Sequence, residues 1–570
     1  MKSQQDLKNQ LMSINRKGYP AYKSLKGQYN YGSYILSIDH VQGDPYASPS
    51  RLRIIIPHGK ALFPPELYDL PHKRTALEDY LLRLFYAAIG RCSYKTAGSG
   101  KSGMLSVSRC GQEILERTAC HFYPDRIEVR LDAGFPANGR TINAAELERM
   151  LCELLPPCVH SVFYYSRLDK QNIDNIIHLA IDQEAVRSEL DSRKLAAFIA
   201  DGSILPRESG VSSLPLKNAV PFYSPDSLAV TLQLPHRGTI RGMGIPRGIT
   251  LIIGGGYHGK STLLKALEDG VYNHIAGDGR EYVITSADAV KIRSEDGRSI
   301  RSVNISPFIN NLPNGKDTRC FTTGDASGST SQAAGIAEAV ESGSRLLLMD
   351  EDTCAANFMV RDELMQKIIS RDREPITPFL ETALPLYEHY GISTILAAGS
   401  SGAYFHIAGT IIMMDSYTAR DITADVKKAL PGKDRDSVIL YGRDRPLLER
   451  TAFQRIIKPS VSAAEERSRI KLYGNDSFEY NKDSVDLRYL EQIADAEQTA
   501  ALGYLLKYII EKLADGRKTI SQLIREADSL IGEHTMTVLA DGPHLSCGLA
   551  RPRIQEIHAC LNRYRKLNIV

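Results

Sequence analysis

The stretch Gly254-Gly255-Gly256-Tyr257-His258-Gly259-Lys260-Ser261-Thr262 decides the fold of this chain. It matches G-x-x-x-x-G-K-[ST], the phosphate-binding loop, at every fixed position. The apolar run 249–253 (ITLII) predicts a buried strand that enters the loop, and 263–267 (LLKAL) predicts a helix that leaves it. A chance glycine-rich turn would not carry strand, helix and full pattern together. The stretch therefore predicts a nucleotide site in an α/β domain.

Each residue type in this loop suits a part of a nucleotide. Glycine lets successive backbone N–H groups point at phosphate oxygens, and the N-terminus of the following helix adds positive potential. We expect residues 254–262 to surround the phosphates of ATP. Lys260 is expected to reach the β- and γ-phosphates and to serve in catalysis, and the Ser261 hydroxyl to ligate Mg²⁺. ATP and Mg²⁺ are therefore the expected cofactors.

The composition is that of an ordinary globular protein. The 570 residues are 43% hydrophobic and 24% charged, which is enough chain for two to four domains, and the net charge of +3 does not by itself imply a polyanionic partner. Nine cysteines lack the spacing of a zinc site and predict free thiols in a reducing compartment. We find no signal peptide, and no run approaches the roughly 20 apolar residues of a membrane helix. The sequence thus predicts a cytoplasmic protein with no membrane partner.

Residues 1–165 predict an α+β domain. Its patterns are helical at 6–14 and 77–89, and strand-like at 29–41, 51–56 and 127–131.

This domain also contains a false phosphate loop, Gly98-Ser99-Gly100-Lys101-Ser102-Gly103. The first required glycine is replaced by Lys95, and no apolar strand leads in, so we reject it as a nucleotide site. We expect a flexible loop instead. Residues 85–111 contain no acid and four basic residues, Arg91, Lys95, Lys101 and Arg109. They could contact a nucleic-acid backbone or form a solvated basic loop, and both interpretations stay open.

A second phosphate-transfer element follows about 90 residues after Lys260. Residues 346–352 (LLLMDED) predict an apolar strand that ends in acids. Asp350 suits Mg²⁺ held through water, and Glu351 suits polarisation of the attacking water. Residues 391–398 (GISTILAA) predict the next strand, which ends at a glycine- and serine-rich turn. We therefore expect a parallel sheet over 248–416 whose strand ends face the ligand.

Between these elements lies the small, hydroxyl-rich turn 326–334 (ASGSTSQAA), with a helix expected from Ala333 to Val340. Free N–H groups and hydroxyls at a helix N-terminus suit a γ-phosphate. Because the phosphate loop already binds the phosphates of its own subunit, the natural ligand of this turn is nucleotide bound to a second subunit. A serine-glycine linker is the alternative, and the helix behind the turn argues against it. The turn thus predicts an ATP-dependent homodimer.

The remaining segments are less specific. Residues 174–200 predict charged helices, and 221–234 predict strands in which Phe222 or Tyr223 could stack on adenine, although a core role is more frequent for aromatics. Residues 449–570 predict a mainly helical domain, with helices at 487–513, 519–531 and 553–565. After Pro543 it has five basic residues against one acid, Glu556; they are Arg551, Arg553, Arg563, Arg565 and Lys566. This basic end could contact nucleic acid or act as a docking arm.

The order of motifs resembles the ATP-binding cassette (ABC) class, and more narrowly the predicted ATPases of that class that lack membrane domains. The resemblance is carried by 38–45 (IDHVQGDP), 99–103 (SGKSG), 242–264, 277–283 (GDGREYV), 295–298 (EDGR), 305–313 (ISPFINNLP), 326–334 (ASGSTSQAA), 349–362 and 550–553 (ARPR). It implies a P-loop NTPase core of ABC type at 166–448. The α+β domain at 1–165 would precede that core, and the helical domain at 449–570 would follow it.

The resemblance also implies roles. Gly254, Gly259, Lys260, Ser261 and Thr262 would cradle ATP. Asp350 would serve Mg²⁺ and Glu351 catalysis. The signature turn that acts on the partner's ATP would be Ser327, Gly328 and Ser329, with Ser329 where most members have glycine. Asn357 occupies the position at which the family has an aspartate that contacts the partner subunit. Asn310 is our substitute for its Mg²⁺-sensing glutamine, and Ser400 or Ser401 replaces its switch histidine. Family members have been associated with RNA handling.

These observations predict a soluble, Mg²⁺-dependent ATPase that dimerises around two ATP molecules. It would couple hydrolysis to conformational change on nucleic acid, with RNA favoured. A nucleotide-gated scaffold that holds a protein partner with little turnover is the first alternative; the missing switch histidine favours it and Glu351 disfavours it. A small-molecule kinase is the second, and the signature turn and the Asp350-Glu351 pair argue against it.

Overall fold

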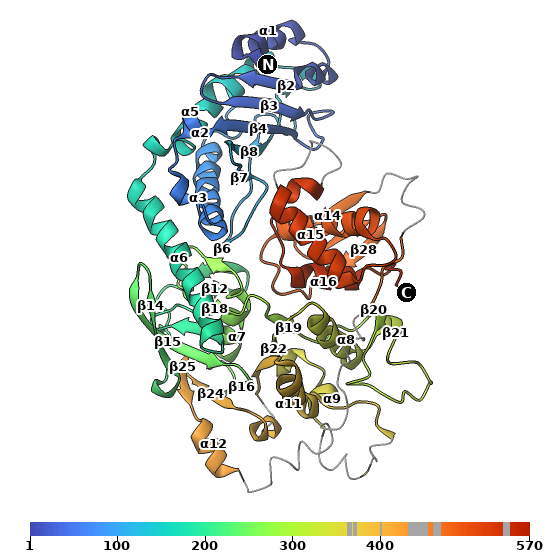
Figure 1. Ribbon diagram of the computed structural model, residues 1–570. Helices are drawn as coiled ribbons and strands as arrows, with labels where there is room; N and C mark the ends of the chain where they lie inside the picture. Colours follow the sequence, from blue (N-terminus) through green and yellow to red (C-terminus); the bar gives the residue numbers. More distant parts are fainter. Residues whose placement is uncertain are drawn as a thin grey trace. The chain divides into compact units, whose positions relative to one another are not determined.

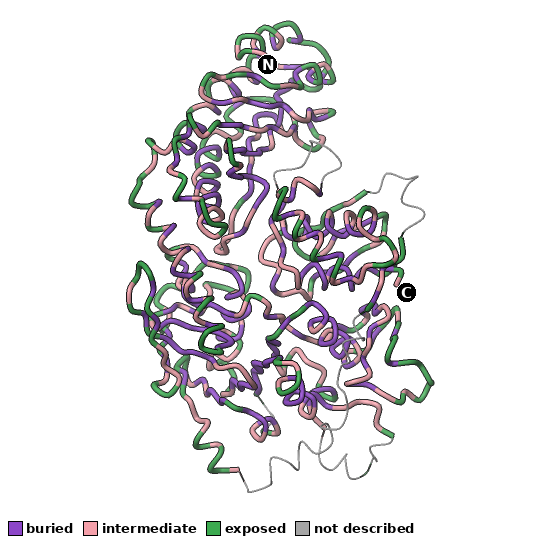
Figure 2. Tube along the Cα trace, viewed as in Figure 1, coloured by how far each residue is buried: buried purple, intermediate pink, exposed green. Residues whose placement is uncertain are grey.

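The computed structural model describes residues 1–361, 368, 373–399, 402–430, 454–459, 469–539 and 548–569. The chain forms two compact units, one of residues 1–181 with 530–551 and one of residues 182–529 with 552–570 (Figure 1). Figure 2 shows buried segments running through the strands and helices of each. The division at 165/166 and 448/449 stays a prediction. No helix in the described part of the chain is long and apolar enough to cross a membrane.

The first unit is built on a seven-stranded sheet in the order β1-β2-β3-β4-β8-β5, with β7 also paired to β8. Its strands are β1 (Lys2–Ser3), β2 (Gly27–Asn30), β3 (Ile35–His40), β4 (Ser50–Pro57), β5 (Leu105–Ser106), β7 (Cys120–Phe122) and β8 (Arg126–Ala133). The helices are α1 (Gln4–Ile14), α2 (His58–Ala61), α3 (Pro71–Gly90), α4 (Ala144–Glu148), α5 (Leu155–Val162) and the start of α6 (Lys170–Ser192). The α+β prediction for this segment agrees with these elements.

One local prediction in this unit was wrong. The pattern at 29–41 is not one strand but the hairpin β2–β3, because Gly32 adopts a left-handed φ of 81° and the N–H of Tyr31 donates to the carbonyl of Tyr34. In the glycine-rich loop at 98–103, the Lys101 N–H and ammonium donate to the carbonyls of Pro45 and Ala47, and the Gly103 N–H donates to that of Gly134. The flexibility of this loop stays a prediction.

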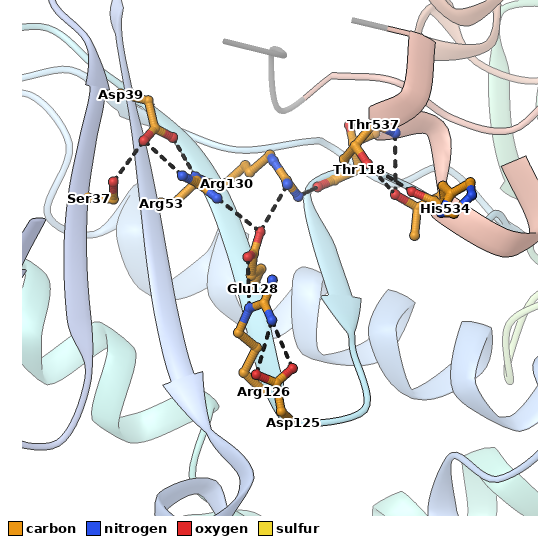
Figure 3. A network of polar contacts seen from close by, with 11 residues as sticks. Ser37, Asp39, Arg53, Thr118, Asp125, Arg126, Glu128, Arg130, His534 and Thr537 are labelled. Carbon is orange, nitrogen blue, oxygen red and sulfur yellow. Dashed lines mark hydrogen bonds and ion pairs between the residues drawn. The ribbon is translucent and has the colours of Figure 1, made fainter. Parts of the chain in front are cut away.

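Charged and apolar residues alternate along β8 (RIEVRLDA). Three of the charged residues, Arg126, Glu128 and Arg130, belong to a network of polar contacts with neighbouring strands (Figure 3). Arg53 joins Asp39, at 2.5 Å, to Glu128, at 3.4 Å, and Arg130 and Arg126 bond the same glutamate at 3.0 and 2.9 Å. Burial alone would raise the pKa of Glu128, but the arginines beside it hold that pKa below its usual range. The charges of this network are therefore neutralised from within the sheet.

The core of the second unit is a six-stranded sheet in the order β19-β22-β23-β16-β24-β25. It is parallel up to β24, and β25 is antiparallel. Its strands are β16 (Ile249–Ile253), β19 (Val290–Ile292), β22 (Leu346–Asp350), β23 (Ser393–Ala397), β24 (Thr410–Asp415) and β25 (Thr418–Asp421). The helices are α7 (Lys260–Asp269), α8 (Gly328–Glu341), α9 (Ala356–Met359), α11 (Phe379–Tyr390) and α12 (Thr423–Ala429). The expected parallel sheet is confirmed, and its strands are apolar because both faces are covered.

Smaller antiparallel sheets accompany this core. One runs β14 (Ala229–Leu234), β15 (Gly238–Pro246), β11 (Leu195–Ala200), β18 (Val283–Thr285). Two others are the strand pairs β12 (Arg207–Ser209) with β13 (Ser212–Pro215), and β20 (Arg298–Val303) with β21 (Phe321–Ala326). The helical prediction for 174–200 was too long, because α6 ends at Ser192 and β11 begins at Leu195. Phe222 is buried in the core, whereas Tyr223 is exposed.

The C-terminal segment is helical, with α14 (Ala496–Tyr508), α15 (Ile520–His534) and α16 (Ile554–Arg563). Sequence reasoning missed a small antiparallel sheet in it, formed by β26 (Ile470–Tyr473), β27 (Ser477–Tyr480) and β28 (Asp483–Asp486). The eight cysteines among the described residues of the whole chain are free thiols, as predicted.

His558 on α16 makes a testable contribution to stability. Burial, with Arg455 and Arg525 nearby, lowers its pKa from 6.5 to about 3. Between these values the unfolded chain binds a proton that the folded chain does not, so stability rises with pH across this window by up to about 1.4 kcal/mol per pH unit. When the pH is lowered from 7 to 5 in thermal melts, the Tm of His558→Gln should fall by less than the Tm of the wild type. The exposed His534 is the control; equal pH dependence in His558→Gln and His534→Gln would contradict this assignment.

Candidate nucleotide site

The strand ends meet at one edge of the parallel sheet. The register pairs Asp350 of β22 with Ala397 of β23, and Ala397 with Ile252 of β16. The acidic strand end, the turn after β23 and the phosphate loop therefore leave the sheet side by side, as the sequence predicts for strand ends that face a ligand.

The phosphate loop curls around its own lysine. Lys260 is the first residue of α7, and its ammonium donates to the carbonyls of Gly254 at 2.8 Å and Gly255 at 2.9 Å. Gly259 precedes the helix with a left-handed φ of 99°. The top of the loop and Ser261 are exposed. Because the first N–H groups of a helix have no partner within it, this arrangement fits a phosphate.

The turn between β24 and β25 packs against the loop, a contact that sequence reasoning missed. The N–H of Ser416 donates to Nδ1 of His258 at 2.9 Å. A Cβ on Gly254 would lie 2.4 Å from the carbonyl oxygen of Met414, and one on Gly259 would lie 2.8 Å from the Tyr417 ring. Packing against this turn therefore requires glycine at both positions.

The catalytic candidates converge on the turn after β23. The Gly399 N–H donates to Oε2 of Glu351 at 2.7 Å, and a Cβ on Gly399 would lie 4.0 Å from Nζ of Lys260. Asp350 accepts from the N–H of Asp352 at 3.2 Å. Lys260 and Glu351 therefore border one glycine. The predicted switch residues Ser400 and Ser401 lie outside the described residues, and their role stays a prediction.

The signature turn is the N-terminus of α8 itself. The helix was expected to begin at Ala333 but begins at Gly328, because the Ser331 N–H already donates to the Ser327 carbonyl at 2.8 Å. Ser327 is exposed and Ser329 is buried. Of the signature hydroxyls, the one that solvent reaches is therefore that of Ser327, which lies 2.9 Å from Oγ1 of Thr330.

The two asparagine candidates differ. Asn357 is exposed on α9, where a partner could reach it. The Asn310 amide donates to the carbonyl of Ser306 and accepts from Thr318 at 3.3 Å, so its described contacts lie outside the phosphate loop. The metal role of Asn310 stays a prediction that these contacts do not support.

The basic C-terminal end is already engaged within the protein. Arg551 pairs with Glu116 at 3.0 Å in the first unit. In the second unit, Lys566 pairs with Asp483 at 2.7 Å and Arg553 donates to the Ala289 carbonyl at 3.0 Å. Both interpretations of this end, a nucleic-acid contact and a docking arm, stay predictions.

Three family models match the chain. The model of the ABC-class ATPase N-terminal domain matches residues 4–166, that of the ABC ATPase P-loop domain matches 169–438, and that of the MRB1590 C-terminal domain matches 469–570. An uncharacterized protein of Methanocaldococcus jannaschii is 32% identical over 214 residues, which are 34% of this chain and 48% of the relative. The chain thus spans about half of that relative's length.

Among solved structures, cbiO1 of Clostridium perfringens, part of an ABC transporter complex, is 13% identical with a TM-score of 0.26 and covers 41% of this chain and 91% of its own. An ATP-binding cassette of an ABC transporter in its ADP conformation is 12% identical with a TM-score of 0.26 and covers 42% and 98%. Because these TM-scores are low, the assignment of the chain to the ABC class rests on the family models.

Proposed function

Because this chain is an ATPase of the ABC class, with the N-terminal and P-loop domains of that class, we propose that two copies close head to tail on two ATP molecules. Each site would combine one phosphate loop with the partner's signature turn. The observation that carries this proposal is the split geometry. Lys260 and Glu351 border Gly399 at one edge of the sheet, while the exposed Ser327 begins a separate helix.

Within each site the residues divide the chemistry. Lys260 neutralises the β- and γ-phosphates, and the backbone of residues 254–262 holds them in place. Ser261 and Asp350 would hold Mg²⁺, which when bound would neutralise further phosphate charge. Glu351 orients the attacking water and accepts its proton, and the Gly399 N–H fixes one of its carboxylate oxygens for this task. Opening and closing of the dimer then moves the domains at 1–165 and 449–570 relative to the core at 166–448.

We propose RNA as the ligand that is coupled to this cycle in the cytoplasm. The family that the sequence resembles has members associated with RNA handling, and the MRB1590 C-terminal domain model matches residues 469–570. In the first unit, Arg91 and Lys95 are exposed and flank Tyr94, which is 62% exposed and has a left-handed φ of 58°. Two exposed cations close in sequence to an exposed ring suit backbone phosphates and a stacked base.

Steady-state ATP hydrolysis with and without single-stranded RNA tests this proposal. We expect RNA to stimulate ATP turnover and the stimulation to weaken as salt rises from about 50 to about 200 mM, because salt weakens contacts between basic side chains and phosphates. The double variant Arg91→Glu/Lys95→Glu should lose most of the stimulation, and Lys60→Glu, an exposed lysine of the same unit, should keep it. If RNA does not change the turnover, the proposal that RNA is the coupled ligand is wrong.

The scaffold alternative has one supporting observation. The turn after β23 has glycine and serine where the family places a histidine. A scaffold would bind ATP and dimerise with almost no turnover, so the basal rate measured in the same experiment separates the two functions.

A further inference from the structure

The signature turn rests on a second turn of the same unit, residues 294–297 (SEDG), which we call the support turn. The Gly297 N–H donates to the carbonyl of Ala326 at 2.9 Å. The Glu295 N–H donates to Oγ of Ser331 on α8 at 2.8 Å. The support turn is therefore bonded on both sides of the signature.

The support turn also limits the space at the middle signature residue. A Cβ on Gly328 would lie 3.2 Å from Oδ1 of Asp296 and 3.3 Å from Cβ of Ser294. The two turns are thus in direct contact. Since packed interiors transmit displacement, a shift of the support turn moves the N-terminus of α8.

The end of α16 holds the support turn. α16 packs on α8 and β20 (Figure 1). Arg563 forms a buried ion pair with Glu295. Arg565 reaches further, because its Nη2 donates to the carbonyl of Gly297 at 3.0 Å and its Nη1 to that of Gly324 at 2.8 Å. Its guanidinium fork therefore joins the support turn to β21, the strand that leads into the signature.

The two arginines differ as probes. Loss of Arg563 would leave Glu295 buried and unpaired, which threatens folding. Arg565 is exposed, so its loss removes two hydrogen bonds without burying a charge. Its neighbour Lys566 is also exposed and pairs with Asp483 of β28, which is not a residue of the support turn. Lys566→Ala is therefore a matched control.

We propose that Arg565 is a positioning residue for the signature turn, through which the C-terminal domain sets the rate of the ATP site that this turn completes. The inference rests on the head-to-tail dimer proposed above. A ligand that moves α16 would change hydrolysis on the partner's nucleotide through the support turn. The EDGR motif at 295–298, which contains Glu295, Asp296 and Gly297 of the support turn, would thus link the C-terminal domain to the signature turn.

Arg565→Ala should leave ATP binding to the single chain unchanged and lower turnover of the dimer about fivefold, the order expected for charge-assisted hydrogen bonds at the surface. Arg565→Lys should recover part of the rate, because its ammonium can donate to one of the two carbonyls but lacks the guanidinium fork that bonds both. Lys566→Ala should match the wild type. Wild-type turnover in Arg565→Ala would overturn the inference.

Mixing variants separates this role from general stability. A mixed dimer of Arg565→Ala and Lys260→Ala chains has one site in which an intact phosphate loop meets an intact signature turn. Turnover of the mixture should therefore exceed that of either variant alone. A Ser327→Arg and Lys260→Ala mixture is the reference. If only the reference gains, Arg565 does not act through the signature turn; if neither gains, the head-to-tail dimer is wrong and the inference falls with it.

Discussion

Glu351→Gln is expected to lower ATP turnover by about 100- to 1000-fold and to trap an ATP-bound dimer. The glutamine keeps the size of the side chain and can still accept from the Gly399 N–H, which now bonds Oε2 at 2.7 Å. It can no longer take the proton of the attacking water. Nucleotide binding should survive, because the Lys260 loop is untouched. Size-exclusion chromatography with and without ATP, beside a turnover assay, measures both effects.

Asp352→Asn provides the control for this variant. Asp352 follows Glu351 directly and is exposed, and its described bond to Asp350 uses the backbone N–H rather than the carboxylate. It should therefore turn over and elute like the wild type. A Glu351→Gln chain that stays monomeric with saturating ATP would mean that the sandwich model is wrong.

Ser327→Arg is expected to abolish hydrolysis while each chain still binds ATP. Ser327 is exposed at the start of α8 and its side chain makes no cap hydrogen bond, so the fold should tolerate the change. A bulky cation would block the approach of the signature turn to the partner's γ-phosphate. Equilibrium binding of a labelled ATP analogue and steady-state turnover measure the two properties separately.

The comparison with Thr330→Val sharpens this test. Thr330 lies one turn along, half-buried, with its Oγ1 2.9 Å from Oγ of Ser327. Its substitution removes that hydrogen bond without adding bulk or charge, so turnover should fall far less than in Ser327→Arg. Equal loss of ATP binding and hydrolysis in Ser327→Arg would instead make the turn part of the site of its own chain.

Local patterns in the sequence determined the nucleotide core. The phosphate loop, the acidic strand end at 346–350 and the strand at 393–397 could be predicted because apolar runs and glycine positions encode them within about ten residues. These apolar strands also predicted a parallel sheet, because the strands of a parallel sheet are covered on both faces. The family models for residues 4–166 and 169–438 agree with that assignment.

Tertiary structure alone decided what holds these motifs in place. The turn after β24 clamps the loop through His258 and two glycines, and Gly399 brings Glu351 and Lys260 together across three strands. Residues of the basic C-terminal end bond carbonyls and acids of the same chain, as Arg565 does to Gly297, and the sequence did not indicate these partners. A side chain's charge is visible in sequence, but its partner lies up to hundreds of residues away, and only the folded backbone brings that partner within hydrogen-bond distance.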